Sequence, residues 1–220
     1  MRDIVIFGIG QIAEVVHYYL SNEGRRRVVA FTVDEAFRST DRLMGLPVVP
    51  FENVQGDYPP ETHEMFVATS FRGVNRLREE KVNQAKSKGY ALAAHVSPRA
   101  TVWDGFVAQE NTIVMEENVI QPFVTVGRNV IMWSGNHIGH HTSIADHCFI
   151  ASHVVVSGNV TVGEGTFIGV NATLRDGIKV GQRNVIGAGA LILGDTPDGG
   201  VFMGSATPMS KVPSHRLRSI

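Results

Sequence analysis

A short stretch of the sequence, SGNHIGHHTSIADHCFIASH, contains five histidines. They are His137, His140, His141, His147 and His153. Neutral imidazole is a good ligand for zinc, and it is also the side chain best suited to accept a proton near neutral pH. The cluster could therefore hold a metal ion, supply a catalytic base, or lie on the surface without a chemical role. The choice among these depends on the direction in which each side chain points.

The repeat that contains these histidines predicts those directions. From Val96 to Ile192 every sixth residue is apolar, and the position four residues later is mostly small or β-branched. Glycine often follows the apolar residue directly, at a turn that leaves little room for a side chain. A period of six is the signature of a parallel β-helix, in which three hexads form one coil. We therefore predict about five coils over residues 96–193, stacked as a triangular prism with the apolar residues inside.

In this register Ile138 points into the prism, and His137 directly precedes it. The other four histidines fall in the middle of their hexads, at positions that mostly lie on the outer surface. We therefore expect them at or near an outer face, available to solvent or to a neighbouring subunit. For His147 and His153, a solvated surface position is the simplest interpretation.

The prism resembles the left-handed β-helix of the hexapeptide acyltransferases, whose trimers place active sites between neighbouring prisms. The segment HIGHHTSIADHCFIASHVVVSGNVTVGEGTFIGVNATL more specifically resembles bacterial nucleotide-sugar acetyltransferases, both the sialic-acid O-acetyltransferases and the N-acetyltransferases of the bacillosamine and perosamine type. In that family the general base is a histidine eighteen residues before the glycine of a G-N-V-x-I-G stretch. His140 stands eighteen residues before Gly158 of GNVTVG. The resemblance implies that His140 is the base and that the Gly158 N–H faces the thioester carbonyl.

Acyl transfer from a thioester fits such a pair. Imidazole, with an ordinary pKa near 6.5, can take the proton of the nucleophile, and a backbone N–H one strand spacing away, about 4.8 Å, can stabilise the developing oxyanion. Members of the family often carry an acidic residue directly after the base, but here that residue is His141. We expect His141 to contact the substrate. The nearest carboxylate that could orient His140 is Asp146, and a neighbouring subunit is the other source.

The last coils and the tail, residues 169–193 and 200–208, resemble the part of the family that binds acyl-CoA between subunits. The resemblance thus implies acetyl-CoA as co-substrate and a homotrimer. Five residues are candidates for lining the cofactor groove: Val170, Asn171, Gly187, Ala188 and Gly204. Corner geometry alone would also explain the glycines.

Before residue 95 the sequence alternates between strand and helix patterns, which indicates parallel βαβ units. We expect strands at 3–8, 27–34, 46–50, 64–70 and 90–96, and helices at 11–24 and 75–89. The predicted fold is therefore an α/β domain with a small Rossmann-like parallel sheet, residues 1–95, followed by a left-handed parallel β-helix with a C-terminal tail, residues 96–220.

The loop FGIGQIAEVV follows the first strand and opens the first helix, so its glycines would let a phosphate approach the helix N-terminus. Ala13 stands at the third glycine position, which makes the dinucleotide signal weak. In the family that the chain resembles, the corresponding domain binds the nucleotide of a nucleotide sugar. The predicted substrate-binding residues besides His141 are Gly8, Gly10, Gln11, Asp34, Asn75 and Arg78; a solvated charged helix would explain Arg78 equally well.

Composition excludes several functions. The 220 residues are 43% hydrophobic, carry a formal net charge of −1 and contain no basic run of five or more, so we expect no nucleic-acid partner and no membrane insertion. The single cysteine, Cys148, excludes an internal disulfide and agrees with a reducing, cytoplasmic location. We expect no metal. The γ-class carbonic anhydrases bind zinc on a similar prism with two histidines five residues apart, and no two histidines of the cluster have that spacing.

Together the two halves predict an acetyl-CoA-dependent N-acetyltransferase that acts on a nucleotide-linked amino sugar, at a 4-amino group. Three alternatives remain. A sugar O-acetyltransferase would use the same base and groove, and a zinc-dependent lyase of the carbonic anhydrase type would contain metal. A non-catalytic binding protein on the same scaffold would bind neither acyl-CoA nor nucleotide sugar, and the alignment of His140 with Gly158 argues against it.

Overall fold

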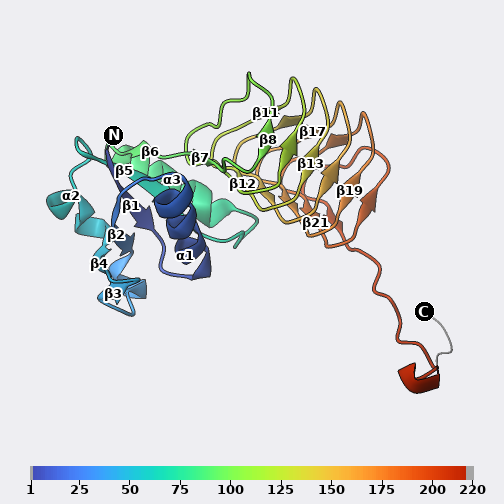
Figure 1. Ribbon diagram of the computed structural model, residues 1–220, viewed down its shortest axis with the longest axis horizontal. Coiled ribbons are helices and arrows are strands. Elements are labelled where there is room, and N and C mark those ends of the chain that lie inside the picture. The colour runs from blue at the N-terminus through green and yellow to red at the C-terminus, as the bar shows by residue number, and fades with distance from the viewer. Residues whose placement is uncertain (1, 217–220) are drawn as a thin grey trace.

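The computed structural model of the protein describes residues 2–216. A unit of strands and helices lies at one end, a prism of stacked coils follows it, and the last residues leave the prism as an extended arm (Figure 1). No helix in the described part of the chain combines the length and the apolar character needed to cross a membrane.

The N-terminal unit is a six-stranded sheet in the order β3-β4-β2-β1-β5-β6, parallel except for the β3–β4 pair. Its strands are β1 (Asp3–Phe7), β2 (Val28–Val33), β3 (Arg42–Leu43), β4 (Leu46–Pro50), β5 (His63–Val67) and β6 (Ala91–Leu92). The helices are α1 (Gln11–Tyr18), which continues as a π-helix over Tyr19–Glu23, α2 (Val54–Asp57) and α3 (Arg76–Ser87). The unit also has 3-10 turns at Glu35–Phe37 and Phe51–Asn53, and another, Ser214–Arg216, lies in the C-terminal arm. The predicted α/β unit is thus confirmed, and the strand expected at 90–96 is divided, because its second half joins the prism.

The prism has three faces, each a parallel sheet of two-residue strands. We call the first the covered face: β7 (His95–Val96), β9 (Ile113–Val114), β12 (Ile131–Met132), β15 (Phe149–Ile150), β18 (Phe167–Ile168), β21 (Val185–Ile186) and β23 (Val201–Phe202). The apolar face has β8 (Thr101–Val102), β10 (Val119–Ile120), β13 (His137–Ile138), β16 (Val155–Val156), β19 (Thr173–Leu174) and β22 (Leu191–Ile192). The polar face has β11 (Thr125–Val126), β14 (Ser143–Ile144), β17 (Thr161–Val162) and β20 (Lys179–Val180), with a single bridge from Val180 to Thr196 beyond it.

The second residue of each regular strand points inward, as the six-residue period predicts. Ile138, Ile150 and Leu174, for example, are fully buried and belong to one continuous core. Successive coils pair with a register of eighteen residues, so that Val119 lies beside His137 and His137 beside Val155.

The hexad that ends at Ala108 departs from this pattern. Ala108 is half-buried and lies in no strand, and the polar face therefore begins only at β11. The corner before it is intact, since the Phe106 N–H donates to the Trp103 carbonyl at 2.9 Å, and the Trp103 ring packs over Gly105. The apolar period is kept here although the strand is lost.

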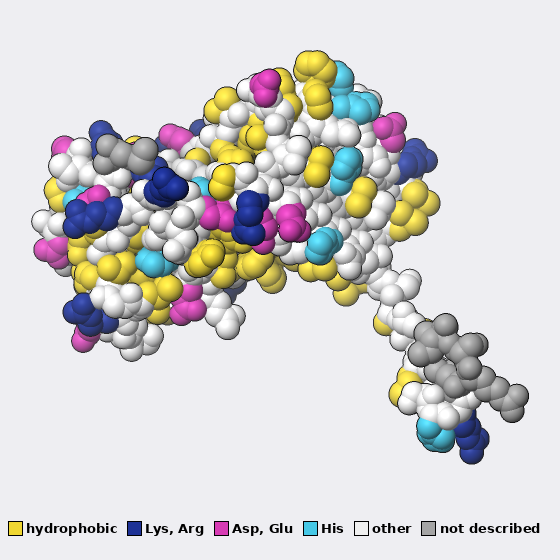
Figure 2. Space-filling view, in the orientation of Figure 1, with side chains coloured by type: hydrophobic (Ala, Val, Ile, Leu, Met, Phe, Trp, Pro, Cys, Tyr) yellow, Lys and Arg dark blue, Asp and Glu magenta, His cyan; other side chains and the backbone are white. Residues whose placement is uncertain are grey.

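The outward residues of the three faces differ in character. On the covered face Ile113, Ile131 and Phe149 are buried, because the N-terminal sheet unit packs over them and shares one hydrophobic cluster with them. The polar face presents Thr125, Ser143, Thr161 and Lys179 in the same positions. On the apolar face the outward residues alternate between polar ones, Thr101, His137 and Thr173, and apolar ones, Val119, Val155 and Leu191, which are 38%, 40% and 61% exposed. Figure 2 shows hydrophobic and histidine side chains interspersed over the visible side of the prism.

Helix α3 joins the sheet unit to the prism through a fully buried arginine. The guanidinium of Arg78 donates hydrogen bonds to the side chain and carbonyl of Asn129 and to the carbonyls of His147 and Cys148, all at distances of 2.9 to 3.3 Å. It also donates to Asn75, whose amide donates to the Gly165 and Thr166 carbonyls. Burial lowers the pKa of Arg78 to about 10, so the group stays charged at neutral pH.

We expect Arg78→Ala to destabilise the protein by about 3 kcal/mol or more, because hydrogen bonds to a charged group contribute about 1.5–3 kcal/mol each and the carbonyls would lose their donor. Urea unfolding measures the change. Arg76→Ala, one exposed position on the same helix, is the control and should stay within about 0.5 kcal/mol of the wild type. A loss of less than about 1 kcal/mol for Arg78→Ala would show that this contact does not hold the two parts together.

Three histidines make the fold sensitive to acid. Burial lowers the pKa of His17, His95 and His147, although carboxylates near His95 and His147 act in the opposite direction. Because the unfolded chain then binds more protons below about pH 6.5, the free energy of unfolding should fall between about pH 7.5 and pH 5.5. The His95→Gln/His147→Gln variant should lose less over this range. Denaturant unfolding at both pH values tests this, and an equal fall in the two proteins would contradict it.

Candidate active site

His140 and His141 form a pair at the corner between β13 and β14, where the apolar face meets the polar face. Both side chains are exposed, as the register predicts. The backbone N–H of His140 donates to the side-chain oxygen of Gln121 at 2.9 Å. The Nδ1 atoms of His140 and His141 lie 3.2 Å apart, and the two rings are almost perpendicular. The Phe123 ring packs on His141 with centroids 4.7 Å apart. One Nδ1 must carry a hydrogen for the pair to bond, and this leaves the Nε2 of that ring without one.

Gly158 lies one coil beyond His140, against its imidazole. A Cβ at Gly158 would come within 2.7 Å of Cε1 and 2.8 Å of Nε2 of His140, so a side chain at this position would push the ring away. The Asn159 N–H donates to the His140 carbonyl at 2.8 Å, which fixes the two coils in register. No acceptor among residues 2–216 takes the Gly158 N–H. The corner thus combines an exposed imidazole with a free backbone donor.

Asp146 does not reach this corner, and the prediction that it orients His140 is wrong for the single chain. It lies at the next corner, where its carboxylate accepts from the Arg128 N–H at 2.8 Å and from Nη2 at 2.7 Å. Burial alone would raise the pKa of Asp146, but the hydrogen bonds and charge of Arg128 outweigh it and hold the pKa below its usual value. In the single chain it is His141, at 3.2 Å, that contacts Nδ1 of His140.

The predicted cofactor residues lie at the opposite edge of the apolar face, where it meets the covered face. Val170, Asn171 and Ala188 are exposed there. Gly187 and Gly204 stack backbone on backbone, since a Cβ on Gly204 would collide with the Ala188 carbonyl, and this packing accounts for both glycines. Within one chain, the structure does not bring this group together with His140.

A cleft of about 830 Å³ opens at the carboxyl ends of β1, β2 and β5. Four predicted residues line it: Gly8, Gly10, Gln11 and Asp34. Gly8 has a φ of +122° and would place a Cβ 2.7 Å from the Ala68 carbonyl, so its glycine is required by the fold. No atom lies within 4 Å of the position that a Cβ on Gly10 would take, so the start of α1 is open to a ligand.

The cleft also contains residues that the sequence analysis missed. Lys81 donates to Asp34 at 2.7 Å, and Phe37 and Arg72 lie on its lining. Arg72 follows β5, and the carboxyl ends of parallel strands meet at one edge of a sheet, so its place after a strand was an available signal. Lys81 carried no such signal, because the charged pattern of its helix does not say which face is covered.

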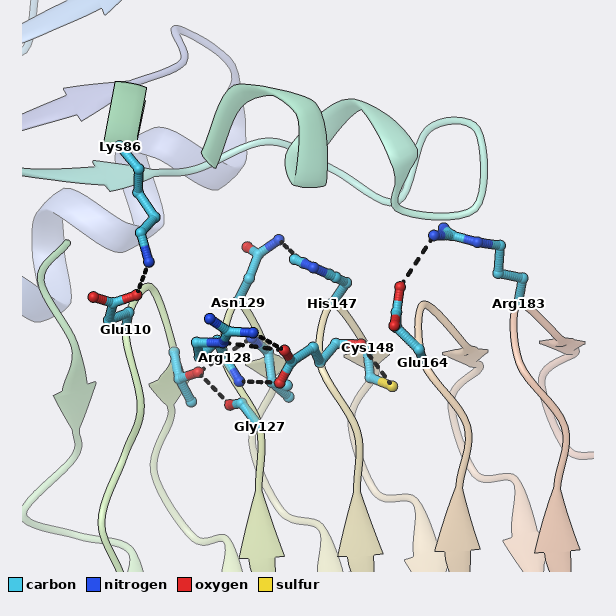
Figure 3. Close-up of polar contacts among 12 residues, drawn as sticks. Lys86, Glu110, Gly127, Arg128, Asn129, His147, Cys148, Glu164 and Arg183 are labelled. Carbon is cyan, nitrogen blue, oxygen red and sulfur yellow. Dashed lines mark hydrogen bonds and ion pairs between the residues drawn. The ribbon is translucent and has the colours of Figure 1, made fainter. Parts of the chain in front are cut away.

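The structure contradicts the prediction that Asn75 and Arg78 contact the substrate. Both are fully buried, and their polar atoms bind the prism. The reason is that α3 lies over the corner between the polar and covered faces (Figure 3), and these two side chains bind carbonyl groups of that corner.

Glu79, His147 and Glu164 meet under α3, with ligand atoms within 4.8 Å of one another. Arg183 Nη2 binds both glutamates, at 2.9 and 3.2 Å, and supplies the positive charge there. The Asn129 oxygen accepts from Arg78 and Asn111, so its amide nitrogen faces His147 Nδ1 at 2.8 Å (Figure 3). In neutral His147 the Nδ1 lone pair then accepts from Asn129 and Nε2 carries the hydrogen, so neither ring nitrogen has a free lone pair for a metal.

Comparisons with known proteins agree with this architecture. Residues 159–194 match the family Bacterial transferase hexapeptide (six repeats), while no curated protein matches the chain. A perosamine N-acetyltransferase from Caulobacter crescentus, solved in complex with CoA and GDP-perosamine, is 27% identical and has a TM-score of 0.84, with 93% of this chain and 94% of that chain covered. The acetyltransferase domain of PglB from Neisseria gonorrhoeae is 26% identical with a TM-score of 0.82, covering 95% and 100%.

WeeI from Acinetobacter baumannii, 18% identical, shares the fold with a TM-score of 0.75 over 93% of this chain and 97% of its own. The N-terminal sheet unit, the three-faced prism and the hexapeptide repeat thus occur together in solved proteins of similar length. These observations show that the chain has the left-handed β-helix fold and the hexapeptide repeat, and that it is similar over its length to CoA-dependent acetyltransferases.

Proposed function

We propose that the protein transfers the acetyl group of acetyl-CoA to an amino group of a nucleotide-linked sugar. The observation that carries this proposal is the contact between the exposed imidazole of His140 and the backbone of Gly158, whose N–H is free. The similarity to a perosamine N-acetyltransferase bound to CoA and GDP-perosamine supports the choice of both substrates.

In the proposed reaction the substrate nitrogen attacks the thioester carbon directly. The N–C bond forms while His140 Nε2 takes a proton from the amine, and the Gly158 N–H stabilises the negative charge on the carbonyl oxygen. The C–S bond then breaks, and the departing thiolate takes a proton from the imidazolium. The contact between the two Nδ1 atoms supports His141 as the residue that keeps the hydrogen of His140 on Nδ1.

We assign the nucleotide to residues 1–95 and the acetyl transfer to residues 96–220. In the cleft of the sheet unit, the open start of α1 at Gly10 suits a diphosphate, and Arg72 adds positive charge. One carboxylate oxygen of Asp34 accepts a hydrogen bond from Lys81, and the other can accept one from a ribose hydroxyl. The one cysteine, buried and free, agrees with action in the reducing cytoplasm.

We further propose a homotrimer in which the apolar faces meet. His140 lies at one edge of this face, and Val170 and Ala188 lie at the other. Packing two prisms side by side along it would bring the base of one chain toward the cofactor residues of the next. The exposed Val119, Val155 and Leu191 support burial of this face.

Replacement of the base tests the mechanism. We expect His140→Ala to lower kcat by on the order of 10² to 10⁴, because a positioned general base contributes that much to the rate. Release of thiol from acetyl-CoA is measured with a panel of UDP-, dTDP- and GDP-linked 4-amino-4,6-dideoxy sugars, and His63→Ala, a half-buried histidine at the amino end of β5, serves as control. Turnover with hydroxyl sugars alone would replace the proposal by O-acetylation, and unchanged turnover in His140→Ala would exclude this base.

Replacement of an apolar-face residue tests the trimer. We expect Val155→Lys to dissociate it and to lower activity at least about tenfold, since a lysine charge buried between prisms costs several kcal/mol. Light scattering after gel filtration gives the mass, and Thr161→Lys on the polar face should leave both mass and activity unchanged. A wild-type monomer with full activity would contradict the proposed assembly.

A further inference from the structure

A carboxylate faces Gly158 from the side opposite His140. Gly158 and Asp176 are eighteen residues apart, and the Gly177 N–H donates to the Gly158 carbonyl at 3.0 Å, so their coils are adjacent. A Cβ on Gly158 would lie 2.8 Å from Nε2 of His140 and 3.2 Å from Oδ1 of Asp176. The imidazole and the carboxylate therefore converge on one point, which is empty only because the residue between them is glycine.

Asp176 differs from the other aspartates of the later coils. Asp146 binds Arg128, Asp195 accepts from the Lys179 N–H at 2.8 Å, and Asp198 accepts from the Gln182 N–H at 2.8 Å. In the described part of the chain, Asp176 has neither a hydrogen bond nor an ion pair, and it is exposed. Its carboxylate therefore stabilises no turn among the described residues and is free to bind a ligand.

We propose that Asp176 determines specificity by holding the substrate amine as its ammonium ion beside Nε2 of His140. This inference rests on the proposed N-acetylation. An alkylamine is mostly protonated near neutral pH, and a carboxylate forms a strong charge-assisted hydrogen bond with an ammonium group. A hydroxyl group at the same sugar position carries no charge and gains much less from Asp176.

The proton balance follows from this placement. His140 removes one proton from the ammonium, and this proton passes to solvent. The neutral nitrogen attacks the thioester carbon, the new C–N bond forms, and His140 takes the second proton. The C–S bond breaks and the thiolate leaves with that second proton, so each acetylation yields the amide, CoA thiol and one released proton. Asp176 stays ionised throughout and stabilises the imidazolium form of His140 across the gap at Gly158.

The variant Asp176→Asn keeps the shape and removes the charge. We expect kcat/KM for the nucleotide-linked amino sugar to fall about 10-fold to 100-fold, mainly through a higher KM, because hydrogen bonds to charged groups contribute about 1.5–3 kcal/mol. The KM for acetyl-CoA should not change. Asp176→Glu should recover part of the loss, and Asp57→Asn, an exposed aspartate at the end of α2, is the matched control.

A binding measurement without acetyl-CoA separates this role from a structural one. By calorimetry, the wild type should bind the amino sugar nucleotide more tightly than the hydroxyl analogue, and Asp176→Asn should bind the two equally. A kcat/KM within twofold of the wild type, or an undiminished preference for the amine, would overturn the role of Asp176 while leaving N-acetylation intact. A wild type that acetylates no amine would overturn both.

Discussion

Backbone hydrogen bonds between coils set the geometry of everything chemical in this protein. The His137 N–H donates to the Val154 carbonyl at 2.9 Å, the Val155 N–H donates to Ala172 at 3.0 Å, and the same pattern continues along the prism. Residues eighteen apart therefore stand in columns, one strand spacing of about 4.8 Å from each other. The contact of His140 with Gly158 is one step in such a column, so main-chain bonds hold it in place and no flexible side-chain network is needed.

The corners add a second constraint, because one residue in each turn from Asn111 to Gly189 is held at positive φ. In the column beside the candidate site these residues are Phe123, His141, Asn159 and Gly177. Glycine and asparagine accept this conformation readily, whereas Phe123 and His141 adopt it at a cost of about 1–2 kcal/mol each. The rigid stack of coils imposes the conformation. The same turn brings the His141 ring against both Phe123 and His140.

The prism could be predicted almost completely from the sequence, because a period of six fixes both the inward positions and the coil length, and His140 with Gly158 follows from that count. The period could not reveal that residues 103–112 lose a strand, since Ala108 keeps the apolar pattern. It also gave no sign of the partners of Asp146 or Arg78. Asp146 pairs within its own corner, and Arg78 is buried only because α3 packs on the prism, a contact between segments distant in sequence.

The stacking of similar coils does not by itself limit their number, because each added coil presents the same unpaired main-chain edge to the next one. Exposed edges of this kind invite chain-to-chain pairing. In this protein, β23 pairs with β21, and Thr196 bridges to Val180, so the covered and polar faces each gain one last pairing before the chain departs as the arm. The number of coils is therefore set by the point at which the hexapeptide period stops, since a chain that has left the prism supplies no further strand to the stack.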